Sequence, residues 1–351
     1  MKTFDAIIAG AGIIGVSIAL ELRKRGLNVL VLDRGQPGDE SSTAGAGMLA
    51  ATEVDGPSQL LVLARQSAVM FPDFVAEIQD ATGLTIDFNR RGAICLGESI
   101  PAATPLTDEE LVTLGPALSS SSLPASFVAE DFVDPRTLMP ALVAAAKHQG
   151  VHVHGGSEVT SLLENSKKVT GVATAHTQFS APIVVNCCGA WAKDLSPGVP
   201  TRPVKGHMLA LLPATPHPIR HVIRNRETDV YLVPRRDGII AVGSTVEETG
   251  FDKRVDADTI QRLHQLAADI LPELGEARIH QSWTGLRPGT PDKFPILGPG
   301  DIAGYFIATG HYRNGILLAP ATAKAMADLI TQAPTDFDLS PFVPSRFAPV
   351  T

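Results

Sequence analysis

Cysteine is scarce in this sequence, which has only Cys95, Cys187 and Cys188 among 351 residues. Two of the three are adjacent, which fits poorly with disulfide geometry and excludes a disulfide framework. No CxxC or HExxH pattern occurs, so we expect no bound metal. The few cysteines and the absence of a signal-peptide pattern predict a reducing, cytoplasmic location. No apolar run reaches the ~18 residues that a membrane span needs, so we expect no membrane partner.

Positive charge and aromatic side chains are also sparse. Lys and Arg total 29 against 37 Asp and Glu, the net charge is −8, and only 5% of residues are aromatic. Without a basic run, nucleic acid is not an expected partner. The chain is instead rich in glycine and proline, and 44% of its residues are hydrophobic. Its length exceeds the roughly 250–300 residues at which single cores divide, which predicts two domains.

Residues 4–33 have the pattern of a βαβ unit that binds a dinucleotide. The apolar run FDAIIAG is followed by GxGxxG spacing at Gly10, Gly12 and Gly15, then by a helical pattern and a second strand that ends at Asp33. Gly10 permits a tight turn, Gly12 lets the backbone approach a pyrophosphate, and Gly15 lets the helix pack closely on the strand. At this spacing Asp33 is expected to meet a ribose hydroxyl.

This fingerprint alone does not distinguish NAD from FAD. The segment ESSTAGAGMLAA, residues 40–51, has the small residues of a second backbone cradle over a pyrophosphate. The only other similar glycine run, GPGDIAG at 298–304, contains Pro299 and lacks the flanking strand and helix. With no second nucleotide site, NAD(P)H is not expected to supply electrons, which would then come from the substrate itself.

The rest of the chain predicts an α/β fold. We expect helices over 58–80, 135–149 and 256–270, strands at TIDF (85–88) and GAICLG (92–97), and a Ser- and Pro-rich loop region over 101–125. The apolar run APIVVNCCGAW predicts a strand that returns to the first sheet. From Arg202 the longer alternating strands predict a mainly antiparallel sheet.

The stretch TGHYRNGILLAP places His311, Tyr312 and Arg313 at the start of an uncharged helix that begins near Asn314. One interpretation is a surface turn. The other is a helix whose positive N-terminal dipole is directed at a group that becomes negative.

Four segments, AGAGML, VVNCCGAW, GLRPGTPD and GHYRNGILLAP, together resemble the amino-acid-oxidising FAD-dependent enzymes. The bacterial glycine oxidases of the ThiO type are the most similar, followed by the D-amino acid oxidases, and the resemblance covers nearly the whole chain. It implies FAD as cofactor. Sarcosine-oxidase relatives commonly tether the flavin through a cysteine in the C-terminal third, whereas no cysteine follows Cys188 here. The FAD should therefore be non-covalent.

The resemblance implies a Rossmann-like FAD-binding domain and a second, mainly antiparallel-sheet substrate domain, both discontinuous. We expect the FAD-binding domain to comprise 1–82, 131–199 and 286–351, and the substrate-binding domain 83–130 and 200–285.

The resemblance also implies which residues form the site. Arg287 is the arginine that holds the substrate carboxylate, Tyr231 is its partner, and Arg313 is a second arginine near the pocket. A planar guanidinium can bind a carboxylate in bidentate fashion. Val159 matches the position that meets the adenine end through its backbone. With the motif residues, the expected FAD contacts are Gly10, Gly12, Ile13, Ile14, Gly15, Asp33, Arg34, Ser41, Ser42, Ala46, Gly47, Met48, Val159, His311, Tyr312, Arg313, Asn314, Gly315, Ile316 and Leu317.

The reaction implied is hydride transfer from the substrate Cα to flavin N5, giving an imine that hydrolyses to an oxo-acid and ammonia, while O2 reoxidises the flavin and yields hydrogen peroxide. Glycine, small amines and D-amino acids are the implied substrates. Two alternatives stay open: a D-amino acid or D-proline-type dehydrogenase with another electron acceptor, and a non-catalytic FAD-binding subunit. The resemblance further implies a role in thiamine biosynthesis and a homo-oligomer, often a tetramer.

Several other side chains have structural interpretations. His207 and His311 are candidate bases, but histidines beside strand ends are more often structural. Lys205 is a candidate for promoting oxygen reactivity. Trp191 is expected to anchor the start of a helix rather than to stack on another group, and Cys187 and Cys188 are expected to pack in the core.

Overall fold

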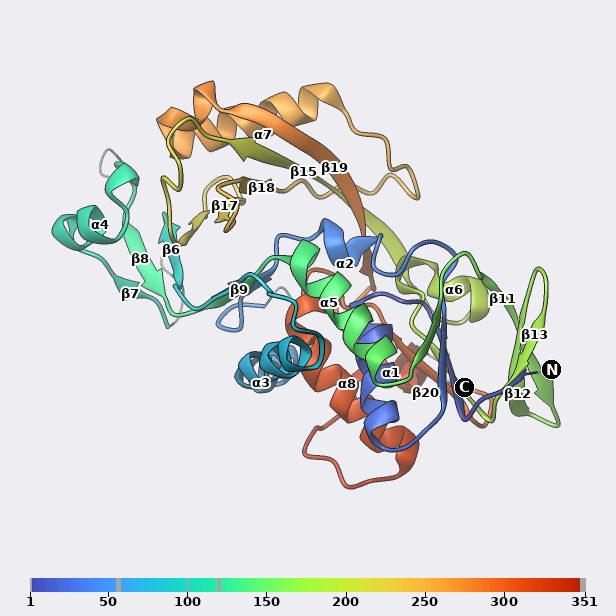
Figure 1. Ribbon diagram of the computed structural model, residues 1–351. Coiled ribbons are helices and arrows are strands. Elements are labelled where there is room, and N and C mark those ends of the chain that lie inside the picture. The colour runs from blue at the N-terminus through green and yellow to red at the C-terminus, as the bar shows by residue number, and fades with distance from the viewer. Residues whose placement is uncertain (1, 55–57, 99, 101, 119–120, 348–351) are drawn as a thin grey trace.

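The computed structural model describes residues 2–54, 58–98, 100, 102–118 and 121–347 (Figure 1). Its helices α1, α3, α5 and α8 gather around one sheet, and α7 lies along the long strands β15 and β19 of another. The helices are α1 (Ile13–Lys24), α2 (Ser41–Ala44), α3 (Ser58–Thr82), α4 (Asp108–Leu114), α5 (Pro135–His148), α6 (Ala192–Leu195), α7 (Ala257–Ile270) and α8 (Gly315–Thr331). Short 3-10 turns are η1 (Pro116–Leu118), η2 (Gly189–Trp191), η3 (Pro272–Glu276), η4 (Ser340–Phe342) and η5 (Pro344–Phe347).

The first sheet, as far as the structure describes it, has six strands in the order β10-β3-β2-β14-β21-β20. All neighbours are parallel except β20 and β21. In β2 the side chains alternate between two cores: Ile8 packs among the helices, and Ile7 faces a small sheet of β1, β13, β12 and β11. Because both faces of this sheet are covered, its strands are continuous apolar runs in the sequence. The strands are β10 (His152–His154), β3 (Val29–Leu32), β2 (Ala6–Ala9), β14 (Ile183–Asn186), β21 (Tyr305–Thr309), β20 (Ile296–Pro299), β1 (Lys2–Thr3), β13 (Gln178–Ser180), β12 (Lys168–Thr174) and β11 (Val159–Asn165).

The strand order of the first sheet reverses between β2 and β14. The chain passes from β2 through α1 to β3 on one side, whereas β14 pairs with β2 on the other. Ligands of open α/β sheets bind at the carboxyl ends of the strands at such a reversal. Gly10 and Cys187, which follow β2 and β14, occupy that place. The predicted return of APIVVNCCGAW to the first sheet is confirmed.

The second sheet has eight described strands in the order β19-β15-β18-β17-β16-β6-β8-β7. All pairs are antiparallel except β16 and β6. One face packs against α7, and the other carries Met208, Tyr231 and Val233 toward Ala46, which follows α2. The strands are β19 (Arg278–Gly289), β15 (Arg202–Leu212), β18 (Ile240–Gly243), β17 (Val230–Pro234), β16 (Val222–Asn225), β6 (Ala93–Leu96), β8 (Ala125–Val128) and β7 (Thr104–Pro105).

The predicted fold class, α/β with a Rossmann-like sheet and a mainly antiparallel second sheet, is confirmed. The domain boundaries stay a prediction, and β19 continues to Gly289, so Arg287 lies on a strand of the second sheet. A small sheet of β4 (Met48–Leu49), β9 (Asp131–Val133) and β5 (Phe88–Asn89) also forms.

The helices expected over 58–80, 135–149 and 256–270 are confirmed as α3, α5 and α7. The strand expected at TIDF was wrong for most of its length, since only Phe88 belongs to β5. Side chains take over its backbone bonds: Ile86 N–H donates to Gln79 Oε1 at 2.8 Å and Asp87 N–H to Thr137 Oγ1 at 3.0 Å.

The loop expected over 101–125 was wrong where α4 forms; positions 101, 119 and 120 lie outside the described residues. Thr107 and Glu110 make a capping box, in which each side chain bonds the backbone N–H of the other residue. This pattern, visible in the sequence as TDEE, offsets the helix-breaking composition around it.

Candidate active site

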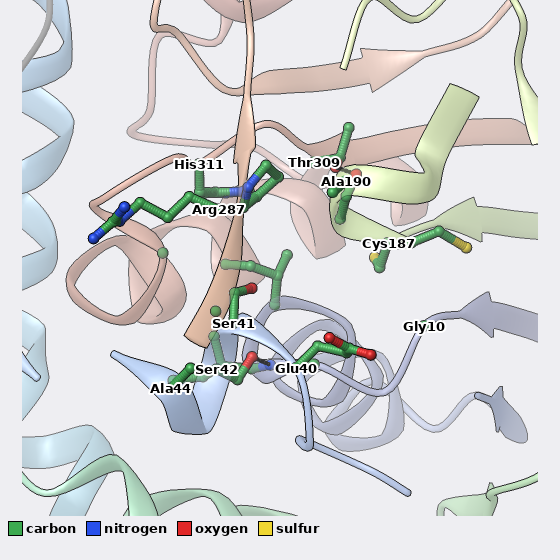
Figure 2. A pocket seen from close by; sticks show the side chains of 18 of the residues that line it. Gly10, Glu40, Ser41, Ser42, Ala44, Cys187, Ala190, Arg287, Thr309 and His311 are labelled. Carbon is green, nitrogen blue, oxygen red and sulfur yellow. Dashed lines mark hydrogen bonds between the residues drawn. The ribbon is translucent and has the colours of Figure 1, made fainter. Parts of the chain in front are cut away.

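One cavity is lined by residues of both main sheets (Figure 2). The first sheet contributes Gly10, Asp33 and Cys187, and the second contributes Tyr231 and Arg287. Figure 2 shows Arg287, Ser42, Glu40 and Cys187 arranged around this space, although they come from distant parts of the chain. A cavity at the junction of two domains is a favoured place for a small-molecule site.

The turn after β2 fits a dinucleotide pyrophosphate. Gly10 has a φ of +103°, and a Cβ built there would lie 2.4 Å from the carbonyl oxygen of Cys187. A Cβ on Gly15 would lie 2.0 Å from the carbonyl oxygen of Gly10, so the start of α1 presses against the turn. Gly12 caps α1 without a side-chain bond and lines the cavity. The positive end of a 12-residue helix therefore opens onto the cavity.

Asp33 lies at the end of β3 and lines the cavity. Its Oδ2 accepts a hydrogen bond from Ala11 N–H at 2.6 Å, and its Oδ1 accepts one from Gly35 N–H at 2.8 Å. These bonds fix the carboxylate, and each oxygen keeps a lone pair for a hydroxyl donor. The arrangement suits the ribose contact, which stays a prediction.

Arg34 forms part of a three-layer stack beside the cavity. Its Cζ lies 3.5 Å from the centroid of the Trp191 ring, and Trp191 stacks on Phe251 with centroids 5.0 Å apart and planes at 27°. Glu40 links the two outer parts of the stack: its carboxylate pairs with Arg34 at 3.1 Å and with Lys253, two residues after Phe251, at 3.0 Å. This stacking of Trp191 differs from the expected role of the residue as an anchor at the start of a helix. No local pattern links it to Phe251, 60 positions away.

The second backbone cradle, predicted over residues 40–51, contains α2 and β4. The Oγ of Ser42 accepts a hydrogen bond from Ile13 N–H at 2.9 Å, which joins the two cradles. Gly47 has a φ of +79°, and a Cβ there would lie 1.8 Å from the carbonyl oxygen of Val133. The buried Arg235 donates to the carbonyl oxygens of Ala46 at 2.7 Å and Val133 at 3.2 Å. Arg235 is a supporting residue that sequence reasoning missed.

The three predicted substrate residues line the same cavity. Arg287 donates through Nη1 to the carbonyl oxygens of Thr245 at 3.1 Å and Lys205 at 3.3 Å, and through Nη2 to Ser244 Oγ at 2.7 Å. Tyr231 is buried, and its hydroxyl donates to Met208 Sδ at 3.4 Å. Arg313 pairs with Asp229 at 3.5 Å.

The segment His311–Leu317 brings the start of α8 to the cavity. Tyr312 has a φ of +49°, and its N–H donates to the carbonyl oxygen of Pro288 at 3.0 Å. Burial lowers the pKa of His311 to about 3, and its Nε2 lies 3.2 Å from Thr322 Oγ1. His311 is therefore neutral at ordinary pH. It lines the cavity, and its contact with FAD stays a prediction.

Most of the predicted contact residues line the cavity, and three do not. Gly15 lies behind the turn, Asn314 caps α8, and Leu317 is buried in the helical core. His207 is fully buried and bonded on both ring nitrogens, and Lys205 donates its Nζ to the carbonyl oxygen of Arg254 at 2.7 Å. Neither is among the residues that line the cavity.

The two vicinal cysteines lie at the carboxyl end of β14 and line the cavity. Burial raises the pKa of Cys187 well above its usual value and that of Cys188 to about 12, so both are neutral thiols. Over the part of the chain that the structure describes, no group of three or more His, Cys, Asp or Glu side chains is placed to hold a metal ion, and no helix is long and apolar enough to cross a membrane.

Comparison with known proteins places the chain in a family. The sequence profile of the DAO family, described as FAD dependent oxidoreductase, matches residues 5–329. The chain belongs to this family of FAD-dependent oxidoreductases, and within it the chain is similar in sequence and structure to glycine oxidases. The glycine-rich turn, the start of α1 at the cavity wall and the second cradle fit FAD, as the sequence predicts.

Three similar proteins illustrate this. The bifunctional protein ThiO/ThiG of Synechocystis is 37% identical over 99% of this chain, which spans 55% of that relative, about half its length. The hydrogen cyanide synthase subunit HcnC of Pseudomonas aeruginosa is 31% identical, covering 99% of this chain and 97% of the relative. The crystal structure of glycine oxidase from Geobacillus kaustophilus superposes with a TM-score of 0.93 at 31% identity, over 99% of each chain.

Proposed function

We propose that this protein oxidises glycine, or another small amino acid or amine, and produces an imine that hydrolyses to an oxo-acid and ammonia, with hydrogen peroxide as the second product. The observation that carries the proposal is the half-buried Arg287 guanidinium, which lines the same cavity as the two FAD cradles. A site with this charge suits a substrate carboxylate rather than a neutral alcohol or a cation.

The bonding of Arg287 leaves room for a carboxylate. Its three hydrogen bonds to Lys205, Thr245 and Ser244 occupy three of the five N–H donors of a guanidinium. The other two are available to the two oxygens of a carboxylate. Tyr231, on the neighbouring part of the cavity wall, supplies a hydroxyl that exchanges a weak bond to sulfur for a stronger one to oxygen.

When bound, FAD supplies the acceptor for the hydride from the substrate Cα and passes the electrons on to O2. The chain itself orients the substrate so that its Cα–H faces the flavin, and it stabilises the negative charge that develops there. Arg313 and the start of α8 supply positive potential on one side of the cavity. With His311 neutral and His207 bonded elsewhere, we expect the amine to bind as the free base after losing its proton to water.

The FAD is proposed to be non-covalent. Both cysteines of the cavity are thiols with raised pKa values, and thiolates are the form that reacts. A role in thiamine biosynthesis, by analogy with the ThiO/ThiG relatives, a cytoplasmic location and a homo-oligomeric state are further parts of the proposal.

A second candidate differs in the electron acceptor. The HcnC relative, named as a subunit of hydrogen cyanide synthase, is similar to this chain along almost its entire length. A dehydrogenase that passes electrons to a partner subunit or a quinone is therefore the alternative. A non-catalytic FAD-binding subunit is disfavoured, because such a subunit has no use for Arg287 in the cavity.

The test is a coupled assay of the purified protein with glycine, sarcosine, D-alanine, D-proline and L-alanine. The proposal predicts substrate-dependent oxygen consumption matched by an equal amount of hydrogen peroxide. Turnover seen only with an artificial dye acceptor would support the dehydrogenase instead. No turnover with either acceptor on any of the five substrates would contradict the proposal.

A further inference from the structure

Arg287 is supported from behind by a distant segment of the chain. Its guanidinium has three hydrogen-bond acceptors. Two of them, Ser244 Oγ and the carbonyl oxygen of Thr245, lie at the start of the connection between β18 and α7, residues 244–256. The third acceptor is the carbonyl oxygen of Lys205 on β15. A Cβ on Gly206 would lie 2.4 Å from both Nη atoms, so the guanidinium lies directly against the backbone of β15. Its position therefore depends on where the 244–256 connection sits.

The 244–256 connection is held to β15 by backbone hydrogen bonds at its first end and, at both ends, by the buried side chain of His207. At the first end, Glu247 exchanges two backbone bonds with Lys205, each of 2.9 Å, and its Oε1 lies 2.8 Å from His207 Nδ1. Thr245 Oγ1 accepts from His207 N–H at 2.9 Å and donates to the same Glu247 oxygen. At the other end, Asp256 N–H donates to His207 Nε2 at 3.0 Å.

These partners define the protonation of the imidazole. A backbone N–H can only donate, so Nε2 must accept from Asp256 and carries no proton. The proton of the neutral ring is then on Nδ1, where the Glu247 carboxylate accepts it. Because His207 is fully buried, neither bond is replaced by water when it is lost.

We infer that His207 is a positioning residue for Arg287: through its Nδ1–H it holds Glu247 and Thr245, and these hold the guanidinium in the orientation that receives the substrate carboxylate. The inference rests on the proposed role of Arg287 as that receptor. It assigns no proton transfer to His207, which acts only through the 244–256 connection.

The test measures binding of acetate, which has the carboxylate of glycine but no amine and cannot be oxidised. Acetate is titrated into the FAD-loaded protein, and its Kd is read from the change in the visible flavin spectrum. His207→Asn places an amide nitrogen where Nδ1 was and keeps the bond to Glu247. His207→Gln places an amide oxygen where Nε2 was and keeps only the bond from Asp256.

We expect the Asn variant to bind acetate about as the unchanged protein does, and the Gln variant to bind it about tenfold more weakly. Both should keep their FAD, and the Gln variant should show the same rise in KM for glycine with little change in kcat. Equal effects of the two substitutions, or no effect of either, would overturn the inference.

A matched pair of glutamates gives a second test that leaves the buried histidine in place. Glu247→Ala removes the carboxylate that joins His207 to Thr245, whereas Glu248→Ala removes an exposed carboxylate that pairs with Arg202 at 3.1 Å. We expect Glu247→Ala to bind acetate more weakly than the unchanged protein and Glu248→Ala to bind it as the unchanged protein does. Equal acetate binding in the two variants would contradict it.

The Arg287→Met variant separates this inference from the proposed function. If that variant binds acetate as well as the unchanged protein does, Arg287 is not the carboxylate receptor and the proposed function fails. If it loses acetate binding while the His207 and Glu247 variants keep it, the receptor stands and only the positioning role fails.

Discussion

Arg287 carries a full charge and three structural hydrogen bonds, so its substitution separates binding from folding. Arg287→Met removes the charge and keeps much of the apolar stem. We expect the purified variant to remain yellow, with the KM for the amino acid raised by about 30- to 1000-fold, since a desolvated charge-assisted pair contributes about 2–4 kcal/mol. Steady-state kinetics check this, and an unchanged KM would refute the role of Arg287.

Two glycines with positive φ test the FAD cradle. Gly10 has a φ of +103° and a backbone oxygen 2.4 Å from the place of a Cβ, whereas Gly26 has a φ of +88° and open space around it. Gly26→Ala should cost only the conformational strain of about 1–2 kcal/mol in unfolding free energy. Gly10→Ala should cost more and yield protein without FAD. Absorbance spectra and urea unfolding compare the two, and a fully FAD-loaded Gly10→Ala protein would contradict the assigned cradle.

His311 predicts a pH dependence of stability. Burial lowers its pKa to about 3 from 6.5 in the unfolded chain, so between these values the unfolded state binds more protons. The contribution of His311 to the free energy of unfolding is fully present above pH 6.5. It is lost as the pH falls toward 3, by about 1.4 kcal/mol per pH unit. Burial also lowers the pKa of His221, which acts in the same direction.

His311→Gln, which keeps a hydrogen-bonding group for Thr322, should flatten this part of the profile. Urea unfolding of both proteins at several pH values between 4 and 7 measures the difference. Parallel profiles would show that His311 is not responsible.

At the scale of elements, the 244–256 connection joins both ends of the site. Its start supports Arg287, and further on Phe251 stacks on Trp191 while Lys253 pairs with Glu40. We expect Phe251→Ala to raise the Kd of FAD several-fold, because it removes the outer layer of the stack that holds Arg34.

Val255→Ala is the matched control for Phe251→Ala. Val255 lies on the same connection and is 43% exposed, close to the 42% of Phe251. Quenching of flavin fluorescence on titration into the apoprotein measures both Kd values. The same Kd for the two variants would show that the stack does not retain FAD.

The elements themselves were largely predictable from the sequence. The βαβ unit, α3, α5 and α7 follow from hydrophobic spacing and from caps such as Asp134, whose side chain accepts a bond from Arg136 N–H. TIDF was mistaken for a strand because the partners of its backbone are side chains rather than a neighbouring strand: Gln79 for Ile86 and Thr137 for Asp87. Local pattern carries no information on such bonds.

The site residues that lie in sequence motifs were predictable, whereas those that depend on contacts between distant parts of the chain were not. Arg287 and Tyr231 were expected because short segments around them resemble those of relatives. Trp191, Arg235 and His207 act through partners 38 to 189 positions away, and no local pattern indicates those contacts. Such supporting residues emerge only once the two sheets are packed together.

At the scale of the whole molecule, two sheets enclose one cavity, with the FAD cradles on the first and Arg287 on the second. This division predicts that the two roles separate: FAD is retained without Arg287, and an amino acid is used only with it. A measurement that observes both roles at once therefore tests the account most directly.

That measurement is an anaerobic titration of the FAD-loaded protein and of Arg287→Met with glycine, followed by admission of air, while the visible flavin band is recorded. We expect glycine to bleach the unchanged protein and air to restore the colour rapidly with formation of peroxide. Arg287→Met should stay yellow at the same glycine concentration. Failure of glycine, sarcosine and the D-amino acids to bleach the unchanged protein, or equal bleaching of both proteins, would contradict it.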